Sequence, residues 1–497
     1  MSAYEVLEKK FKRMSSLGGA SAILHWDNAV MMPGGGAQSR AEQLACLDVL
    51  QHELLVSSEM TDLFDQAQTD VAKLDKWQHA NLREMTNGWR HATALNGDLV
   101  EAFSHATSKC EMQWRSAREN DDFSELQDSL SEVVNLTQEI AAAKAEKFDL
   151  SPYDALLDQY EPGCRQEQID PLFNDLQDFL PSFLEEVLEK QASEKAYEPI
   201  EGPFALDAQK DLGLSFMTDL GFNFDHGRLD TSHHPFTGGT PDDVRLTTRY
   251  ENDDFTQSLM GTLHETGHGL YEQNLPANWR SQPVGQSRGM ALHESQSLLV
   301  EMQLSRSEEF LSYALPKIIT VFKADGDHWS FENFKRLYHR VERGLIRVDA
   351  DEVTYPLHVI LRYRLEKALL SGDLSVADLP GAWNDGMVEL LGIRPSSDQN
   401  GCLQDIHWPG GAIGYFPTYT MGALAAAQFF TTAKKELPDL GASIAAGDFA
   451  PLMTWLKDNV HSLGSLKTTE QILTDATGEG MNTTAFKTHL KTRYLRV

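Results

Sequence analysis

The sequence predicts a mainly α-helical fold that contains one small region of β-structure. Between about residues 60 and 148, apolar residues recur at helical spacing among many charges, and proline and glycine are almost absent. Residues 198–250 differ, because prolines and glycines are frequent there and short runs have strand character. We therefore expect long helices packed antiparallel over most of the chain, with a small sheet in between.

The composition is that of a soluble globular protein. The chain has 497 residues, 41% of them hydrophobic and 24% charged, which is enough for one to three domains. The net charge of −31 argues against nucleic acid and anionic membranes as partners. The acidity is typical of a soluble or salt-adapted surface; a rim that attracts cationic substrates is the alternative.

The cysteines and the N-terminal segment indicate in which cellular compartment the protein is expected. The four cysteines are far apart and form no C-x-x-C pair, which argues against a disulfide framework or a thiolate metal site and fits a reducing compartment. The N-terminal segment is charged and lacks an apolar stretch, and no run of about 18 apolar residues is present for a membrane span. We therefore expect a cytoplasmic protein.

In the N-terminal part, apolar spacing predicts a series of helices. A short helix is expected at 4–14 and a longer one at 37–58, with a glycine-rich turn at 31–36 between them. Another helix follows Ser151-Pro152 and breaks at Glu161-Pro162-Gly163, after which residues 167–194 are again helical.

Three short runs in the glycine- and proline-rich region have strand character. They are residues 222–224, 227–230 and 244–248, which we expect to form a small sheet. Asp253 or Asp254 then suits the N-cap of a new helix.

That new helix carries an H-E-x-x-H motif. His264 and His268 are four residues apart, so on a helix both rings lie on one face, with Glu265 beside them. Two imidazoles at this spacing suit one zinc-like ion, and the glutamate suits a general base that deprotonates water. The plain alternative is a helix turn whose histidines bind nothing.

A catalytic zinc site needs a third protein ligand. Glu294 is the best candidate, because it follows His268 by 26 residues, enough for a loop and a second helix that returns to the motif. His293 competes with it, but adjacent residues on a helix point about 100° apart, so only one of the two faces the metal. The alternative for Glu294 is an exposed helix position.

Two glycines stand out inside the motif helix. Gly267 and Gly269 each cost about 1 kcal/mol relative to alanine there, so either a functional group or a neighbouring helix approaches closely.

The rest of the chain is expected to be mostly helical, with one conspicuous loop. Residues 290–304 predict a second long helix. Residues 401–419 form a loop rich in glycine and aromatics that is expected to be buried against a site. The last 60 residues or so predict ordinary packed helices.

With these residues in order, the chain resembles the M32 metallocarboxypeptidases, the carboxypeptidase Taq family. Five motifs carry the resemblance, together with the segments around Trp26-Asp27 and from His407 to Tyr419. The motifs are His234-Pro235-Phe236, Asp243-Val244-Arg245-Leu246-Thr247, the HETGH motif at 264–268, His293-Glu294-Ser295-Gln296 and Ile346-Arg347-Val348-Asp349-Ala350-Asp351.

The resemblance implies one peptidase domain over residues 1–497, elongated and almost wholly helical, with a deep central groove and a gluzincin-type site. Within it, residues 1–150 would form a helical lid region, 198–250 the small β region and 251–310 the metal-binding helices. His264, His268 and Glu294 would bind one Zn²⁺ per chain, with Co²⁺ as the alternative, and Glu265 would be the general base. The implied activity is release of single C-terminal residues from peptides, with broad specificity and poor cleavage at proline, by a homodimer.

Candidates for substrate contacts follow from the chemistry. Arginine suits the substrate carboxylate, and Arg347 is the first choice, although it could instead pair internally with Asp349, Asp351 or Glu352. A phenol or imidazole suits the developing oxyanion. The candidates are Tyr419, Tyr415 and His407, each of which could also serve only in packing.

Two other residues of the motifs, Arg245 and His234, have more than one expected role. We expect Arg245 to pair with Asp243 or to support the metal helix, and His234 to be either an outer neighbour of the metal site or a structural loop residue.

Two other functions remain open at this point. One is a metallo-oligopeptidase or dipeptidase with the same metal site. The other is a helical binding protein with a structural or vestigial metal site, but such a site normally has four protein ligands and no free glutamate beside it, so Glu265 favours catalysis.

Overall fold

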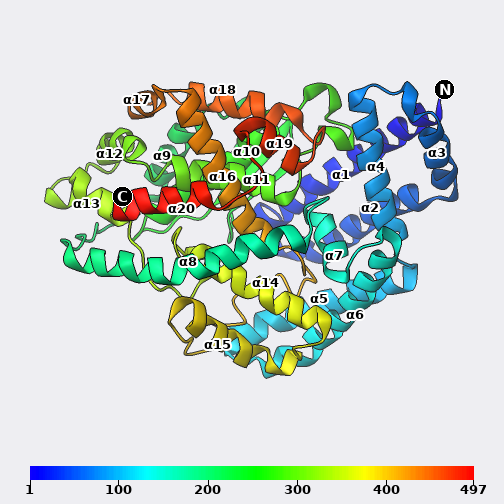
Figure 1. The fold of residues 1–497 in the computed structure, drawn as a ribbon, viewed down its shortest axis with the longest axis horizontal. Helices are drawn as coiled ribbons and strands as arrows, with labels where there is room; N and C mark the ends of the chain where they lie inside the picture. The colour runs from blue at the N-terminus through cyan, green and yellow to red at the C-terminus, as the bar shows by residue number, and fades with distance from the viewer. Residues whose placement is uncertain (497) are drawn as a thin grey trace.

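The computed structural model describes residues 1–496 and shows a mainly helical protein with one three-stranded sheet (Figure 1). This confirms the predicted fold class. Among the described helices, none is both long and apolar enough to cross a membrane. The predicted division into a lid region, a β region and metal-binding helices stays a prediction.

The N-terminal helices lie together at one end of the molecule (Figure 1). The predicted short helix at 4–14 was too short, because the observed helix starts at a capping box on Ser2 and continues past Trp26, which is buried. Gly18 and Gly19 therefore lie inside a helix. The helices are α1 (Ala3–Val30), α2 (Ala37–Val56), α3 (Ser58–Thr69) and α4 (Lys76–Thr93).

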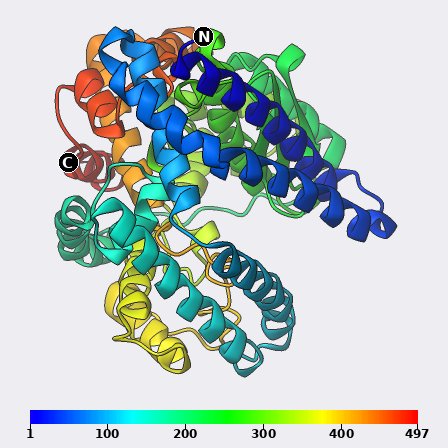
Figure 2. The same ribbon diagram turned by 90° about the vertical axis from the view of Figure 1, so that its right-hand side faces the viewer.

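These helices have a hydrophobic cluster of their own, separate from the main core. It is built from α1, α3 and α4, around residues such as Leu7, Phe64 and Met85. Helix α2 buries no residue, and with α1 it forms a hairpin that projects from the body (Figure 2). The helices that follow, α5 and α6, belong to the main core instead.

The middle of the chain confirms the predicted helices and the predicted break. The chain turns at Glu161, Pro162 and Gly163, as the sequence indicated. The helices are α5 (Gly97–Asn120), α6 (Ser124–Phe148), α7 (Pro152–Tyr160), α8 (Gln166–Ser193) and α9 (Leu206–Asp219).

The sheet has the strand order β1-β3-β2, with β1 parallel and β2 antiparallel to the central β3. Two of its strands were predicted, namely β1 (Gly227–Thr231) and β3 (Asp243–Thr248). The strand expected at 222–224 is wrong, since this segment is a turn whose Phe222 ring packs against Gly269 of the next helix. The third strand, β2 (Phe236–Thr240), was missed because its two glycines hide the alternation of side chains.

The metal motif lies on α10 (Thr256–Gln273), where Asp254 accepts a hydrogen bond from the Thr256 N–H. The second helix was predicted as one regular piece, but α11 (Met290–Leu298) changes into a π-helical turn at Leu299–Leu304. Helices α10 and α11 cross closely at Gly267, where a Cβ would lie 2.4 Å from the Gln296 carbonyl oxygen. Close helix packing therefore accounts for this glycine.

The remaining helices complete the core, and α16 runs across α11 in the middle of the molecule (Figure 1). The aromatic loop at 401–416 leads into α16 and is buried at Trp408, Ile413 and Phe416, as predicted. The helices are α12 (Glu308–Phe322), α13 (Phe331–Tyr338), α14 (Tyr355–Ser371), α15 (Leu379–Leu391), α16 (Pro417–Glu436), α17 (Leu440–Ala445), α18 (Ala450–Asn459), α19 (Thr469–Thr477) and α20 (Thr484–Leu490).

Candidate metal centre and the residues around it

The three residues predicted as metal ligands lie together. His264 and His268 occupy one face of α10, and Glu294 faces them from α11. One nitrogen of each ring and one Glu294 oxygen all lie within 4.8 Å of one another. Glu294 Oε2 is 3.4 Å from Nε2 of His268 and 4.0 Å from Nε2 of His264. This donor set, two imidazoles and one carboxylate, is one that catalytic zinc sites use.

His264 is held from behind by a carboxylate that the sequence analysis missed. Its Nδ1 is 3.0 Å from Oε2 of Glu301, whose other oxygen accepts a hydrogen bond of 2.9 Å from Arg306. Glu301 lies in the π-helical turn after α11. Its spacing of seven residues from Glu294, two helical turns, is a signal that could have found it. The contact at Nδ1 leaves Nε2 free to face the centre.

His293, the competing ligand, supports His268 instead of joining the cluster. The two Nδ1 atoms are 2.6 Å apart, and Nε2 of His293 is 2.8 Å from Oε1 of Glu272. If His293 donates its Nε2–H to that carboxylate, its Nδ1 accepts from His268. His268 then presents an unprotonated Nε2 to the centre, which is the form that binds a metal.

The charges of the centre suit a cation. Burial lowers the pKa of His264, but the hydrogen bond to Glu301 and the carboxylates of Glu294 and Glu265 outweigh it and raise the pKa to about 10. Burial raises the pKa of Glu294, but its hydrogen bond to His268 and the charge of His264 outweigh this and lower the pKa to about 2. The raised pKa of His264 reflects the negative potential that Glu301, Glu294 and Glu265 create at the centre, and the residues present therefore fit a divalent metal ion.

Glu265, next to His264 on α10, is almost fully buried, at 6% exposed. Its Oε2 accepts a hydrogen bond of 2.6 Å from Thr237 Oγ1, and its backbone oxygen lies 3.2 Å from the same hydroxyl. Thr237 belongs to β2, the strand that was missed, so no sequence signal indicated this contact.

The predicted tyrosines and histidine of the aromatic loop are neighbours. Nε2 of His407 is 3.2 Å from the Tyr419 hydroxyl, and the rings of Tyr415 and Tyr419 are 5.2 Å apart. Burial raises the pKa of both phenols, for Tyr419 to about 12, so both are protonated near neutral pH. Burial lowers the pKa of His407 to about 4 and keeps its ring neutral.

Helix α16 carries Tyr419 next to the metal centre, and the loop before it carries His407 and Tyr415. Gly422 lies one turn after Tyr419 and faces Glu294, where an added Cβ would be 2.9 Å from the Glu294 Cβ and Cγ. Only a glycine permits this approach, and the Glu294 carboxylate contributes to the raised pKa values of Tyr415 and Tyr419.

Arg347 is buried beside the same aromatic group, with its guanidinium carbon 4.9 Å from the centre of the Tyr419 ring. None of the three acidic partners considered for it in the sequence is correct. Its Nε and Nη2 donate to Oδ1 of Asp405 at 3.2 and 2.9 Å, and Arg362 donates to Oδ2 of the same carboxylate at 2.6 Å. Two guanidinium groups thus share one carboxylate. Within residues 1–496, no hydrogen bond from Nη1 of Arg347 is found.

The two remaining motif residues lie outside the cluster. Arg245 pairs with Asp243 as predicted, at 2.8 Å, and stacks over the buried Trp26 ring of α1. His234 is exposed in the β1–β2 connection, where its carbonyl oxygen accepts from Ser232. His234 is therefore not part of the group formed by the three candidate metal ligands, although Pro235 beside it lies near Gly261 of α10.

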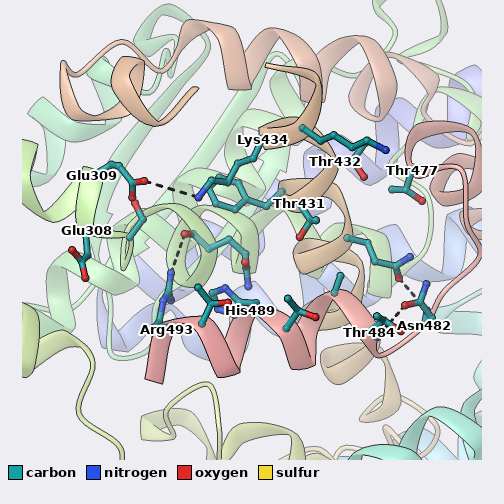
Figure 3. A pocket seen from close by; sticks show the side chains of 18 of the residues that line it. Glu308, Glu309, Thr431, Thr432, Lys434, Thr477, Asn482, Thr484, His489 and Arg493 are labelled. Carbon is teal, nitrogen blue, oxygen red and sulfur yellow. Dashed lines mark hydrogen bonds and ion pairs between the residues drawn. The ribbon is translucent and has the colours of Figure 1, made fainter. Parts of the chain in front are cut away.

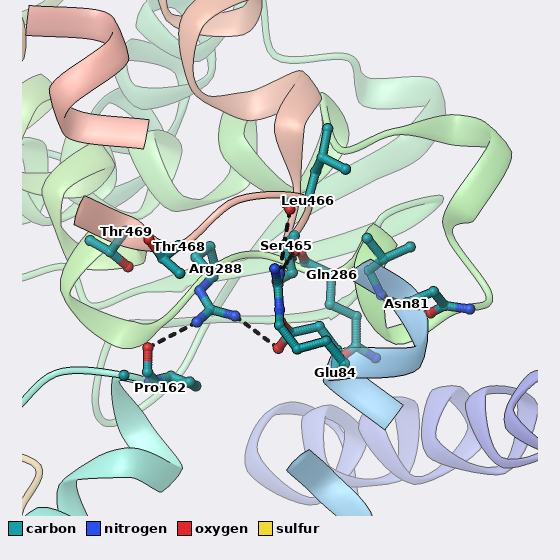
Figure 4. Close-up of polar contacts among 12 residues, drawn as sticks. Asn81, Glu84, Pro162, Gln286, Arg288, Ser465, Leu466, Thr468 and Thr469 are labelled. Carbon is teal, nitrogen blue, oxygen red and sulfur yellow. Dashed lines mark hydrogen bonds and ion pairs between the residues drawn. The ribbon is translucent and has the colours of Figure 1, made fainter. Parts of the chain in front are cut away.

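A buried arginine ties the N-terminal helices to the ligand helix. Arg288 precedes α11 and donates to Glu84 of α4 at 2.8 Å and to the Pro162 carbonyl oxygen at 2.9 Å (Figure 4). Its own N–H donates to the Tyr271 hydroxyl of α10. The start of α11, and with it Glu294, is thereby fixed relative to three other segments.

A separate cavity of about 820 Å³ lies among α12, α13, α16 and α20 (Figure 3). None of the predicted site residues lines it. Its charged walls are largely paired, since Arg493 pairs with Glu352 and Lys434 lies 4.0 Å from Glu309. This pairing leaves the metal centre as the site with unbalanced charge and candidate catalytic groups.

Comparisons with known proteins agree with this geometry. The family model described as carboxypeptidase Taq (M32) metallopeptidase matches residues 6–494. Thermostable carboxypeptidase 1 of Thermus thermophilus is 36% identical over 505 aligned positions, covering 99% of this chain and 98% of that protein. Carboxypeptidase 1 of Bacillus subtilis is 34% identical and covers 98% of each chain. The structure of Trypanosoma cruzi metallocarboxypeptidase 1 superposes with a TM-score of 0.97 at 38% identity over 99% of both chains.

Proposed function

The chain belongs to the carboxypeptidase Taq (M32) metallopeptidases, and from that premise we propose that it releases single residues from the C-termini of peptides, with broad specificity and poor cleavage at proline. The observation that carries the proposal is the pairing of two unbalanced sites. Tyr419 links the centre at His264, His268 and Glu294 to the cationic group at Arg347, since Glu294 contributes to its raised pKa and the Arg347 guanidinium lies 4.9 Å from its ring centre.

The metal would be held by His264, His268 and Glu294, with one Zn²⁺ per chain and Co²⁺ as the alternative. When bound, the ion supplies Lewis acidity, which polarises the scissile carbonyl and lowers the pKa of water at the site. Glu301 and His293 orient the two imidazoles from behind, so that each ring offers its Nε2.

Glu265 would act as the general base and then as the acid. Its carboxylate takes a proton from the attacking water and passes it to the nitrogen of the leaving residue. Burial keeps bulk water from competing for that proton, and Thr237 holds one of the two oxygens.

The free carboxylate of the substrate would bind at Arg347. One carboxylate, Asp405, is shared by two guanidinium groups, so the cluster keeps an excess of one positive charge in a buried setting. Such a charge attracts an anion strongly where water is excluded. The protonated hydroxyls of Tyr415 and Tyr419, with neutral His407 beside them, are suited to donate to the carbonyl oxygen as it becomes anionic.

Three further features belong to the proposal. Substrates would enter a deep groove covered by the N-terminal helices of residues 1–150, of which α1, α3 and α4 share a hydrophobic cluster of their own while α5 and α6 pack in the main core. The protein would work as a homodimer and in the cytoplasm.

A metallo-oligopeptidase or dipeptidase with the same metal site is the second candidate, and the products distinguish the two. The zinc-loaded protein is incubated with a defined peptide of about ten residues, and the products are weighed over time. Loss of one C-terminal residue at a time supports the proposal, and internal fragments or dipeptides overturn it. The same peptide with a C-terminal amide is the control, and it should be cleaved far more slowly because its charge is missing.

A further inference from the structure

We propose that Thr237 is a positioning residue for Glu265, and that its hydroxyl fixes the orientation of the carboxylate which handles the proton. The inference rests on the proposed role of Glu265 as the base. It adds a residue from the sheet to a centre that otherwise consists of helical residues.

The contact is short and one-directional. An ionised carboxylate only accepts hydrogen bonds, so the Thr237 hydroxyl is the donor at 2.6 Å from Oε2. Among residues 1–496, this is the one hydrogen bond found to the Glu265 side chain. With Oε2 engaged, rotation of the carboxylate is restricted, and Oε1 remains as the oxygen that can meet the reacting water.

The donor itself is rigid. Threonine is branched at Cβ and has few side-chain rotamers. Its strand β2 is paired along β3, with Thr237 opposite Leu246, and the neighbouring Phe236 N–H donates to Thr247 Oγ1 at 3.0 Å. The hydroxyl is therefore held by the sheet and not by a mobile loop.

The outer side of the same strand is in contact with the N-terminal helix. At Gly19 of α1 an added Cβ would lie 3.3 Å from the Thr240 methyl group, so helix and strand approach closely. The strand that carries Thr237 is thus supported from both sides, which is the arrangement that keeps a reactive group within a few tenths of an ångström of its working position.

Removing the hydroxyl should slow the chemical step and leave substrate binding intact. Thr237→Val preserves the shape of the side chain and suits a strand, so the fold should tolerate it. For the zinc-loaded enzyme acting on an unblocked peptide, we expect kcat to fall by about 10- to 100-fold, the loss typical of residues that orient a reactive group. KM should stay within about twofold of wild type because no substrate contact is lost.

Rescue by a conservative variant separates orientation from packing. Thr237→Ser keeps the hydroxyl and loses the methyl group, and it should recover most of the kcat. Thr240→Val, on the same strand, is the matched control and should behave as wild type, since no side-chain hydrogen bond of Thr240 is found in the described part of the chain. Bound zinc, counted per chain, should be unchanged in all three variants.

Two results would overturn the inference. One is a kcat of Thr237→Val within about twofold of wild type. The other is a Thr237→Ser variant as slow as Thr237→Val, which would mean that the methyl group matters and the hydroxyl does not. If Thr237→Val fails to fold, Thr237→Ala removes the same hydroxyl and is judged by the same criteria.

Failure of the proposed function has a different signature. If Glu265→Gln remains active, Glu265 is not the base and the proposed mechanism fails. If Glu265→Gln is inactive but Thr237→Val is fully active, only the positioning role of Thr237 fails.

Discussion

The metal centre and the arginine cluster lie on neighbouring elements, but their charges are unbalanced in opposite senses. At the centre, the carboxylates of Glu294 and Glu265 face the two imidazoles, and their negative potential suits a cation. In the cluster, Arg347 and Arg362 share Asp405, and the excess positive charge suits an anion. In the proposed function, a metal ion would meet the first requirement and the free C-terminus of a peptide the second. An exopeptidase would need both, whereas a metal site alone would need only the first.

The two sites also differ in how their supporting residues reach them. The two histidines of the candidate metal centre are supported by different neighbours, Glu301 and His293, so each ring keeps one nitrogen free for the ion. Arg347 and Arg362 depend on one shared carboxylate, which burial would destabilise and the two guanidinium groups hold ionised by lowering its pKa. At the metal centre, substitution of one supporting residue should therefore weaken only the ligand that it holds. In the arginine cluster, substitution of Asp405 should disturb both arginines.

The largest effect is expected when the base is removed and the charge imbalance at the centre changes. Glu265→Gln keeps the shape and the three metal ligands, but it takes away the group that accepts the proton. We expect kcat to fall by about 10²- to 10⁴-fold with zinc still bound, measured by peptide hydrolysis and metal analysis. Glu308→Gln, a surface glutamate, is the control. Activity above about a tenth of wild type would contradict the proposed base.

The next effect tests the opposite imbalance. Arg347→Met leaves Asp405 paired with Arg362 alone, so the excess positive charge disappears. A charge-assisted hydrogen bond of about 1.5–3 kcal/mol is lost, which predicts a 10- to 100-fold rise in KM for peptides with a free C-terminus. The slow cleavage of amidated peptides should not change. Arg364→Met removes a surface ion pair with Glu389 and serves as the control. An equal effect on free and amidated peptides would show that Arg347 acts only in packing.

The grouping of the three candidate metal ligands was predictable from sequence because they are local. Spacing on one helix places His264 and His268, and a short connection returns Glu294 to them. Glu301 was missed although its spacing of seven residues from Glu294 places it on the same side of the helix. Thr237 was missed with its strand, whose two glycines interrupt the side-chain pattern.

The partner of Arg347 could not be found in the same way. The sequence offered acidic residues within five positions, but the structure pairs Arg347 with Asp405, 58 positions away and beyond the two helices α14 and α15. A buried ion pair is chosen by tertiary packing, for which proximity along the chain is a poor guide. The candidates at Tyr415, Tyr419 and His407 lie together because they are close in the chain, the first and third in the loop and Tyr419 in the first turn of α16. The approach of this helix to Glu294 depends on Gly422.

An intermediate effect is expected when the support of a ligand is removed but the ligand stays. Glu301→Gln weakens the hold on His264 Nδ1 and removes one carboxylate from the centre. The affinity for zinc should fall by about 10- to 100-fold, measured by competition with a chelator. With saturating zinc, kcat should recover to near wild type. An unchanged zinc affinity would mean that His264 needs no outer partner.

The smallest effect is expected at His407, which is near both sites but carries no charge. Burial lowers the pKa of its ring to about 4, so the ring is neutral from pH 5 to 8. If its Nε2–H donates to the Tyr419 oxygen, the phenol proton stays available for the carbonyl oxygen of the substrate. His407→Gln retains a donor, and one neutral hydrogen bond is worth about 0.5–1.5 kcal/mol, so kcat/KM should fall by no more than about tenfold. The shape of its pH profile between pH 5 and 8 should stay the same.

The same ring should contribute to acid sensitivity. Because the pKa is lower in the folded than in the unfolded state, where it is about 6.5, unfolding takes up a proton in this range. The contribution to stability is complete above pH 6.5 and is lost as the pH falls towards 4. Wild type should therefore lose more thermal stability than His407→Gln between pH 6.5 and pH 5. Buried His358 and His461, whose pKa values burial also lowers, affect both proteins alike, so the difference isolates His407. Parallel losses in the two proteins would show that the pKa of His407 does not differ between the folded and unfolded states, contrary to the effect expected from burial.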